Sequence, residues 1–196
     1  MLADLVRVTR AFDFACRKHA QQRRKGAGQE PYVNHLAEVA DLVAQATQGS
    51  DPDLVIAALL HDTVEDQDVK REEIVALFGE DVARIVMEVT DDKTLNKDVR
   101  KRLQVEHAAH ISRQARILKI ADKTSNLRSI QHSPPPWPES RKRRYFAWAQ
   151  AVVSQARGVN PWIEAAFDRE YEAALAQGLA QRDFVWHQGL ETEGDD

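Results

Sequence analysis

The segment "AALLHDTVEDQD", residues 57–68, begins with small apolar residues and then presents His61, Asp62, Glu65 and Asp66. In a helix, which turns about 100° per residue, these four side chains would share an arc of less than half the circumference. Carboxylates at such close range repel one another unless a cation or a proton compensates them. The spacing therefore predicts a positive charge beside this segment.

A divalent metal ion could provide that charge, since an imidazole and a carboxylate can both bind one ion. Alone, an HD pair is more often a surface or capping pair, so the hypothesis depends on further ligands. His35 stands at the start of "NHLAEVADLV", and Asp122 lies in "LKIADKTSNL" with Asn126 one turn later on the same helix face. Together, His35, His61, Asp62 and Asp122 would supply two nitrogens and two oxygens to Mn²⁺, Fe²⁺ or a similar ion, with positions left for water or substrate.

Two basic segments could contact phosphate. The loop "QQRRKG" places Arg23, Arg24 and Lys25 shortly before His35, although such a cluster is also typical of a solvated surface. The segment "SRKRRYFAW" could suggest contact with RNA, but its helical spacing directs Phe146 and Ala149 toward a core. Nucleic acid is therefore not expected as a partner.

Composition indicates an ordinary globular protein. The 196 residues are 43% hydrophobic and 30% charged, and the net charge is −4. The apolar run "VIAALL" is too short to span a bilayer, and no secretory signal is evident at the start of the chain. The single cysteine, Cys16, cannot form an internal disulfide, so a cytoplasmic location with no membrane partner is expected.

The dominant hydrophobic period is helical. Leu5, Val8, Phe12, Ala15 and His19 follow this spacing, and Asp51 with Pro52 predicts the start of a helix that continues through the HD pair. Other helices are predicted at 36–43, 70–77, 80–89, 97–109, 115–130, 139–156 and 160–176. The remaining histidines, His107, His110, His132 and His187, like His19, are interpreted as surface or core residues. The predicted architecture is a single-domain, all-α helical bundle.

Several motifs, taken in order, resemble those of the HD-superfamily alarmone hydrolases. These are "YVNHLAEVA", "AALLHDTVEDQD", "FGEDVARIVMEVTDDKTL", "RKRLQVEHA" and "LKIADKTSNLR". The resemblance extends to the hydrolase half of Rel/Spo proteins and, more closely, to the stand-alone metazoan SpoT homologues and bacterial small alarmone hydrolases. The synthetase domain of the longer family members is not expected in this chain.

The resemblance implies a role for particular residues. The metal ligands would be His35, His61, Asp62 and Asp122, usually holding Mn²⁺. Glu65 and Asp66 would activate and position the attacking water. The nucleotide would contact Arg24, Lys25, Lys97, Asn126 and Tyr145. One departure from the family pattern is Leu36, where proline usually follows the first histidine, and this change concerns the start of a helix.

The sequence thus predicts an HD-type metal-dependent phosphohydrolase domain at residues 1–178, followed by a partly acidic extension at 179–196. The expected reaction is hydrolysis of the 3′-pyrophosphate of (p)ppGpp to GDP or GTP and pyrophosphate. Removal of the 2′-phosphate of NADPH and general nucleotide phosphatase activity are alternatives, as is a non-catalytic nucleotide sensor. The identity of the metal, the preferred substrate, the oligomeric state and any regulator are left open by the sequence.

Overall fold

The computed structural model describes residues 2–184 and 186, and in this part of the chain it contains helices and no β-strand. The helices are α1 (Leu2–Lys18), α2 (Val33–Thr47), α3 (Pro52–Leu60), α4 (Thr63–Gln67), α5 (Arg71–Phe78), α6 (Glu80–Val89), α7 (Lys97–His107), α8 (Arg113–His132), α9 (Glu139–Ala156) and α10 (Pro161–Ala176). The predicted all-α fold is confirmed.

Polar side chains mark the starts of several helices. Asp51 accepts a hydrogen bond from the Leu54 N–H at 3.0 Å and precedes Pro52, as the sequence predicts. Ser112 caps α8 in the same way, and Asn160 caps α10. These caps satisfy N–H groups that have no partner inside the helix, so they define where α3, α8 and α10 begin.

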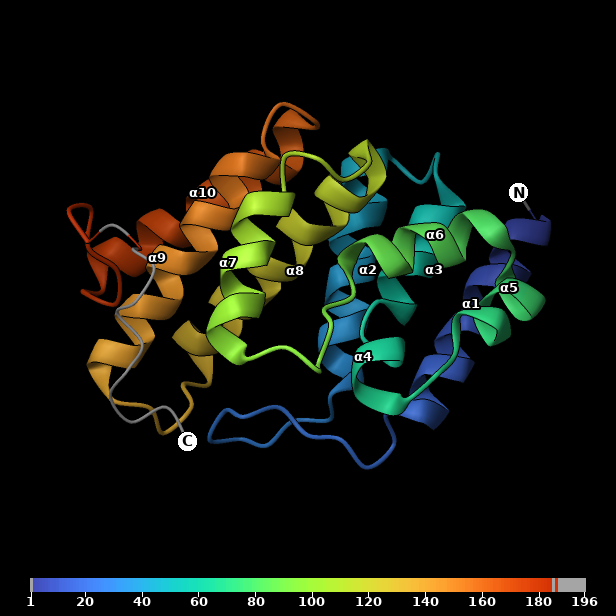
Figure 1. Cartoon of the computed structure of the whole chain (residues 1–196), viewed down its shortest axis with the longest axis horizontal. Helices are drawn as coiled ribbons and strands as arrows, with labels where there is room; N and C mark the ends of the chain where they lie inside the picture. The colour runs from blue at the N-terminus through green and yellow to red at the C-terminus, as the bar shows by residue number, and fades with distance from the viewer. Residues whose placement is uncertain (1, 185, 187–196) are drawn as a thin grey trace.

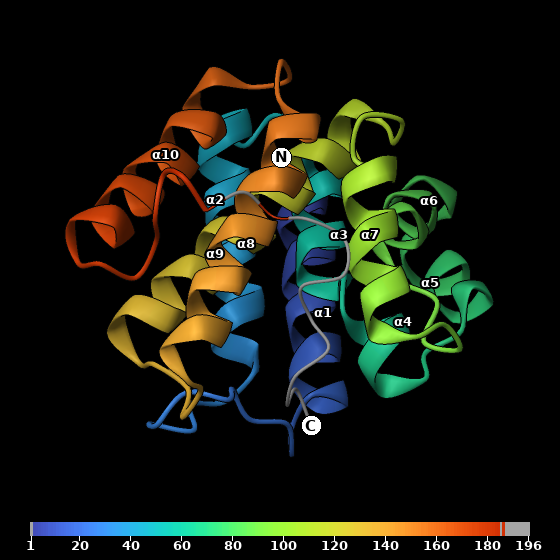
Figure 2. The same ribbon diagram turned by 60° about the vertical axis from the view of Figure 1, so that its left-hand side comes forward.

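Helices α2, α3 and α8 form the centre of the bundle (Figure 1). Helices α9 and α10 lie on one side of them, and α4, α5 and α6 lie on the other, as Figure 2 shows more clearly. The middle of the bundle is filled by aliphatic side chains such as Leu36, Leu60 and Ile120, all fully buried. Residues 19–32 form a long loop along one end of the bundle (Figure 1).

The predicted continuous helix through the HD pair is wrong. Helix α3 ends at Leu60, and α4 begins at Thr63, so His61 and Asp62 lie in the turn between two helices. The Thr63 hydroxyl donates to the Leu60 carbonyl at 2.6 Å, and His61 Nδ1 lies 2.8 Å from the Ala58 carbonyl oxygen. Side chains therefore replace the backbone donors that a longer helix would have supplied at this end.

Only part of the stripe predicted for helix α1 is buried. Leu5 and Phe12 are 60% and 42% exposed, whereas Ala11 and Ala15 are fully buried. The small alanine side chains allow α1 to lie close against α3, which larger residues on that face would prevent. His19 follows the end of α1 and is buried.

No helix in the described ranges 2–184 and 186 combines the length and apolar character needed to cross a membrane. Most of the extension predicted from residue 179, including its acidic end, lies outside the described residues. Within the described part of that extension, Ala180 is buried against the core.

Candidate functional site

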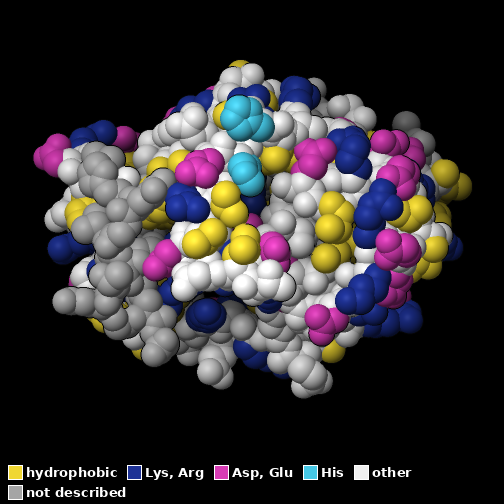
Figure 3. All heavy atoms as spheres, in the orientation of Figure 1, with side chains coloured by type: hydrophobic (Ala, Val, Ile, Leu, Met, Phe, Trp, Pro, Cys, Tyr) yellow, Lys and Arg dark blue, Asp and Glu magenta, His cyan; other side chains and the backbone are white. Residues whose placement is uncertain are grey.

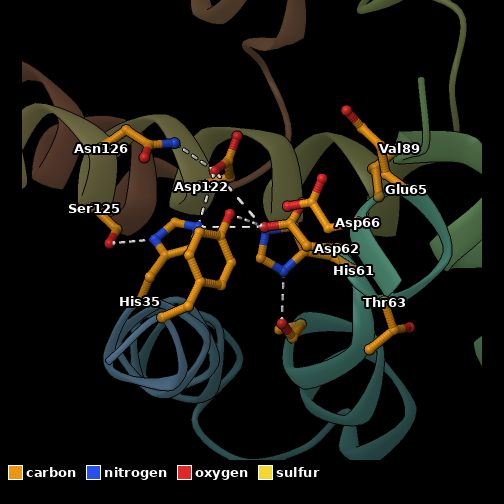
Figure 4. Close-up of polar contacts among 12 residues, drawn as sticks. His35, His61, Asp62, Thr63, Glu65, Asp66, Val89, Asp122, Ser125 and Asn126 are labelled. Carbon is orange, nitrogen blue, oxygen red and sulfur yellow. Dashed lines mark hydrogen bonds and ion pairs between the residues drawn. The ribbon is translucent and has the colours of Figure 1, made fainter. Parts of the chain in front are cut away.

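The four predicted metal ligands meet between α2, α8 and the turn after α3. His35 Nε2 lies 3.4 Å from Asp122 Oδ1 and 3.8 Å from Asp62 Oδ2. His61 Nε2 lies 3.2 Å from Asp62 Oδ2 and 3.9 Å from Asp122 Oδ1. Figure 4 shows both imidazole rings facing the two carboxylates. Residues separated by 87 positions along the chain thus form one cluster, in which His35, His61 and Asp62 alone already place their ligand atoms within 4.8 Å of one another.

The hydrogen bonds of His61 suit it to bind a metal. Its Nδ1 can donate to the Ala58 carbonyl, which leaves the Nε2 lone pair directed into the cluster. This Nε2 atom is buried and makes no hydrogen bond with any residue that the structure describes. Two imidazole nitrogens and two carboxylates are a donor set that fits a divalent metal ion.

Burial and neighbouring charges together set the pKa values of the histidines and aspartates in the cluster. Burial lowers the pKa of His35, which keeps that ring neutral. Burial also acts to lower the pKa of His61, but the adjacent Asp62 carboxylate outweighs it and raises this pKa to about 9. Burial would raise the pKa of Asp62, yet His61 holds it below its ordinary value. When no metal is bound, the adjacent Asp62 carboxylate thus favours the protonated form of the His61 ring.

A buried lysine compensates the fourth ligand. Lys123 Nζ lies 3.0 Å from Asp122 Oδ2 and 4.2 Å from the centre of the Trp148 ring. Burial would raise the pKa of Asp122, and Lys123 instead holds it well below its ordinary value. The ion pair occupies Oδ2, so Oδ1 is the oxygen that faces the two histidines.

The two acidic residues after the HD pair point to different partners. Glu65 accepts from the Asp91 N–H at 3.3 Å and lies 3.4 Å from Arg100 Nη1. Burial raises its pKa, and Asp91 and Asp62 add to the effect. Asp66 instead accepts from Gln22 Nε2 at 2.8 Å and from Lys93 Nζ at 2.6 Å. The predicted acidic pair is thus adjacent in sequence but divided in space.

Three of the cavities near the cluster bear on its chemistry. The ligand cavity, about 150 Å³, is lined by His61, Asp62, Glu65 and Asp122, among others. The cationic cavity, about 310 Å³, is lined by the basic residues Lys25, Lys97, Arg100, Lys101, Arg141 and Arg144. The loop cavity, about 360 Å³, is lined by residues that include Arg24, Lys25, Tyr32, Asp66 and Asn126. On the face shown in Figure 3, basic side chains lie in a hollow between α7 and the loop of residues 19–32.

These cavities share walls. Glu65 and Asp91 line both the ligand cavity and the cationic cavity. Lys25, Trp137 and Tyr145 line both the cationic cavity and the loop cavity. A molecule extending from the ligand cluster would therefore meet cations in one direction and the 19–32 loop in the other.

The predicted nucleotide-binding residues all line these cavities. Arg24 Nη2 donates to Asn126 Oδ1 at 2.9 Å and lies 5.6 Å from the centre of the Tyr32 ring. Asn126 in turn donates to Asp122 Oδ1 at 2.6 Å, which connects the loop to a predicted metal ligand. Lys97 lines the cationic cavity, whereas Lys25 and Tyr145 lie where that cavity meets the loop cavity. Burial raises the pKa of Tyr145 to about 12, so its phenol is protonated at neutral pH.

Comparison with known protein families decides the identity of this arrangement. Residues 11–153, which include the ligand cluster, match the HD domain. The chain belongs to the HD-domain family. This match confirms the HD-domain part of the resemblance that the motifs indicate.

This HD domain has relatives of similar length. It is 46% identical over 181 residues to the guanosine-3′,5′-bis(diphosphate) 3′-pyrophosphohydrolase MESH1 of Xenopus tropicalis, covering 92% of this chain and 99% of that protein. It is 47% identical over 167 residues to the human protein of the same name, covering 85% of this chain and 93% of that protein.

Solved structures are also similar to this chain. One is a metazoan orthologue of SpoT described as hydrolysing ppGpp and playing a role in starvation responses. It has a TM-score of 0.82 and 42% identity, over 88% of this chain and 96% of that one. A protein of Listeria monocytogenes has a TM-score of 0.60 and 30% identity, over 74% and 97% of the two chains.

Sequence analysis of the HD domain missed several residues that touch the ligands. The Tyr32 hydroxyl donates to Asp62 Oδ2 at 2.6 Å, and the Tyr32 ring stacks on His19 with 5.2 Å between centroids. Lys123 could have been noticed as a charged residue beside a ligand in an apolar helix segment. Tyr32 and Ser125, which contacts His35, give no comparable signal, because their partners lie 30 and 90 positions away.

The loop that carries Arg24 is held against the segment that directly follows α8. The Ala27 N–H donates to the Pro134 carbonyl at 3.3 Å, and the Gly28 N–H donates to Ser133 Oγ at 3.3 Å. A Cβ atom on Gly26 would overlap the Ser133 carbonyl oxygen, so only glycine permits this close approach. The loop thus has a defined position relative to the ligand cluster.

Proposed function

We propose that this HD domain hydrolyses the 3′-pyrophosphate of (p)ppGpp, giving GDP or GTP and pyrophosphate, with one bound divalent ion, which we take to be Mn²⁺. The observation that carries this proposal is the shared wall between the ligand cavity and the cationic cavity. A substrate with phosphates on both sides of a ribose can place one group at the ligands and the other among the cations. The relatives named for this reaction match nearly the whole chain.

His35, His61, Asp62 and Asp122 would hold the ion. When bound, it would lower the pKa of a water molecule and draw charge from a phosphoryl oxygen. The Lys123 ammonium, paired with Asp122, would keep that carboxylate ionised and oriented. The Tyr32 hydroxyl would do the same for Asp62 through its 2.6 Å hydrogen bond.

Glu65 is the residue that we assign as proton acceptor. It lines the ligand cavity, and burial raises its pKa toward neutrality, which improves a carboxylate as a general base. The water oxygen would form a bond to phosphorus while the bond between phosphorus and the ribose 3′-oxygen breaks. Glu65 would take the water proton and then return it to the 3′-oxygen, which would leave as the ribose 3′-hydroxyl. Asp66 would act beside it by orienting Gln22 and Lys93 at the edge of the loop cavity.

The nucleotide would lie across the loop cavity. Arg24 donates to Asn126, and the Arg24 guanidinium lies near the Tyr32 ring. In this position the guanidinium could stack on a base or pair with a phosphate. Lys25, Lys97 and Tyr145 would contact phosphate, sugar or base where the two larger cavities join.

The test compares kcat/KM for ppGpp, NADPH, AMP and GMP with Mn²⁺ present. We expect ppGpp to rank first and to release pyrophosphate. Arg24→Ala should lower kcat/KM for ppGpp more than for GMP, because the monophosphate would use only the ligand cluster. Arg17→Ala, which removes an exposed ion pair on α1, is the matched control and should leave both values unchanged.

Two outcomes would contradict the proposal. Rapid turnover of AMP or GMP without release of pyrophosphate from ppGpp would indicate a general nucleotidase. No turnover of any of the four compounds by the metal-loaded protein would indicate a nucleotide sensor.

A further inference from the structure

The second ring nitrogen of His35 faces away from the ligand cluster. Its Nδ1 lies 2.9 Å from Ser125 Oγ, across the contact between α2 and α8 (Figure 4). His35 and Ser125 are 3% and 1% exposed, so this contact is shielded from water. A buried polar contact of this kind constrains both groups strongly, since an unsatisfied partner would be costly.

The direction of this hydrogen bond follows from the next residue. The Ser125 hydroxyl donates its one proton to Glu38 Oε2 at 2.6 Å. Because that proton is used, Oγ can only accept from His35, so the His35 proton is on Nδ1. The Nε2 atom then carries the lone pair that points at Asp62 and Asp122. Glu38 thereby selects, through Ser125, the ring tautomer that can bind a metal.

Glu38 is in turn held in place by Arg128, at the carboxylate oxygen that does not accept from Ser125. Arg128 Nη1 donates to Glu38 Oε1 at 3.1 Å, and Arg128 Nε donates to Glu170 Oε1 at 2.7 Å. Glu38 lies one turn after His35 on α2, and Arg128 lies one turn after Ser125 on α8, so both helices present these pairs in register. Glu170 belongs to α10, which lies beyond the 11–153 match to the HD domain.

The two histidine ligands are therefore oriented by different means. His61 uses the backbone carbonyl of Ala58, whereas His35 uses two side chains that can be replaced. We propose that Ser125 and Glu38 are positioning residues for the metal ligand His35, and that Arg128 and Glu170 hold Glu38 in the required geometry. This inference rests on the metal site of the proposed function and is independent of which substrate is hydrolysed.

The experiment measures Mn²⁺ affinity of the metal-stripped protein without substrate, by titration with detection of unbound Mn²⁺. Removing an outer partner of a metal-bound histidine typically weakens metal binding about 10- to 100-fold. We expect a loss of about tenfold or more for Ser125→Ala and a smaller loss for Glu38→Gln. Co²⁺ absorption spectra of both variants should also change, because the His35 ring is no longer held in one orientation.

A double variant tests whether Glu38 acts on His35 through the Ser125 hydroxyl, a connection that we call the relay, or only through its negative charge. Since Glu38 acts through the Ser125 hydroxyl, Ser125→Ala/Glu38→Gln should bind Mn²⁺ no more weakly than Ser125→Ala alone. Glu164→Gln is the control: this carboxylate on α10 accepts backbone hydrogen bonds from the 158–160 segment and does not touch the relay. Its Mn²⁺ affinity should equal that of the wild type.

Affinities of Ser125→Ala and Glu38→Gln within twofold of the wild type would overturn the proposal. The proposal would also be overturned if the loss of Mn²⁺ affinity in the double variant equalled the sum of the two single losses, since Glu38 would then act by its charge alone. Weakened metal binding in a protein that does not hydrolyse ppGpp would support the relay while contradicting the proposed substrate.

Discussion

The ion pair between Lys123 and Asp122 gives the clearest quantitative prediction. The two charged atoms are 3.0 Å apart, and the Lys123 side chain is only 5% exposed. At an effective dielectric constant of about 20, their attraction is about 5 kcal/mol. Lys123→Met keeps an apolar stem beside Trp148 and leaves Asp122 as a buried charge. Breaking a buried pair in this way costs about 3 to 5 kcal/mol.

Thermal unfolding of the metal-free protein at neutral pH measures this cost. A loss of that size should lower Tm by about 10 °C in a chain of this length. Burial would lower the pKa of Lys123, but Asp122 outweighs it and raises this pKa, so the stabilisation is fully present at neutral pH and disappears only at strongly alkaline pH. Added Mn²⁺ should narrow the difference between the variant and the wild type, because the ion would bring positive charge to Asp122.

Lys119→Met is the matched control for this prediction. Lys119 is also a buried lysine of α8, but its Nζ donates to the Val89 carbonyl at 3.2 Å, and burial lowers its pKa. Losing one hydrogen bond to a carbonyl should cost about 1 kcal/mol. The reasoning is refuted if Lys123→Met loses less than about 1 kcal/mol, or no more than Lys119→Met does.

Three further variants test other parts of the site. His61→Ala should weaken Mn²⁺ binding by more than about 100-fold, so elemental analysis after dialysis should find little bound metal. Full metal content in this variant would show that His61 is not a ligand. Glu65→Gln should lower kcat about 100-fold while metal content stays near that of the wild type, and unchanged kcat would exclude Glu65 as the general base. Gly26→Ala should raise KM for ppGpp without changing Mn²⁺ affinity, because its Cβ would push the 19–32 loop away from Ser133. An unchanged KM would mean that this loop does not bind the nucleotide.

Helical periodicity predicted the positions of the helices well, but it predicted poorly which side chains of α1 are buried. The predicted helix 80–89 has the same bounds in the structure, where Val82, Ile85 and Val86 form its buried face. In α1 the predicted stripe contains Leu5 and Phe12, which are exposed, but also Ala15, which is buried together with Ala11. Periodicity detects that a helix has two faces, but the space available beside α3 decides which face is buried.

The residue types of the candidate ligands could also be predicted from the sequence, whereas the local structure around them could not. Histidine and aspartate have few alternatives as ligands for a divalent ion, so His61 and Asp62 drew attention directly from the sequence. The continuous helix assumed for them was wrong, since His61 and Thr63 use their side chains to end α3. Hydrogen bonds of side chains to nearby carbonyls compete with helix continuation, and periodicity contains no information about that competition.

The sequence by itself determined the all-α class, the positions of most helices, the identities of the candidate ligands and the basic loop before His35. These follow from local rules, because hydrophobic period, capping residues and metal-binding chemistry are properties of residue type and short spacing. Only the tertiary structure decided that Tyr32 donates to Asp62, that Ser125 and Glu38 orient His35, and that Glu65 and Asp66 face different cavities. Those partners come together because α2, α8 and the turn after α3 bury their apolar faces against one another, and that simultaneous packing sets distances that no local pattern encodes.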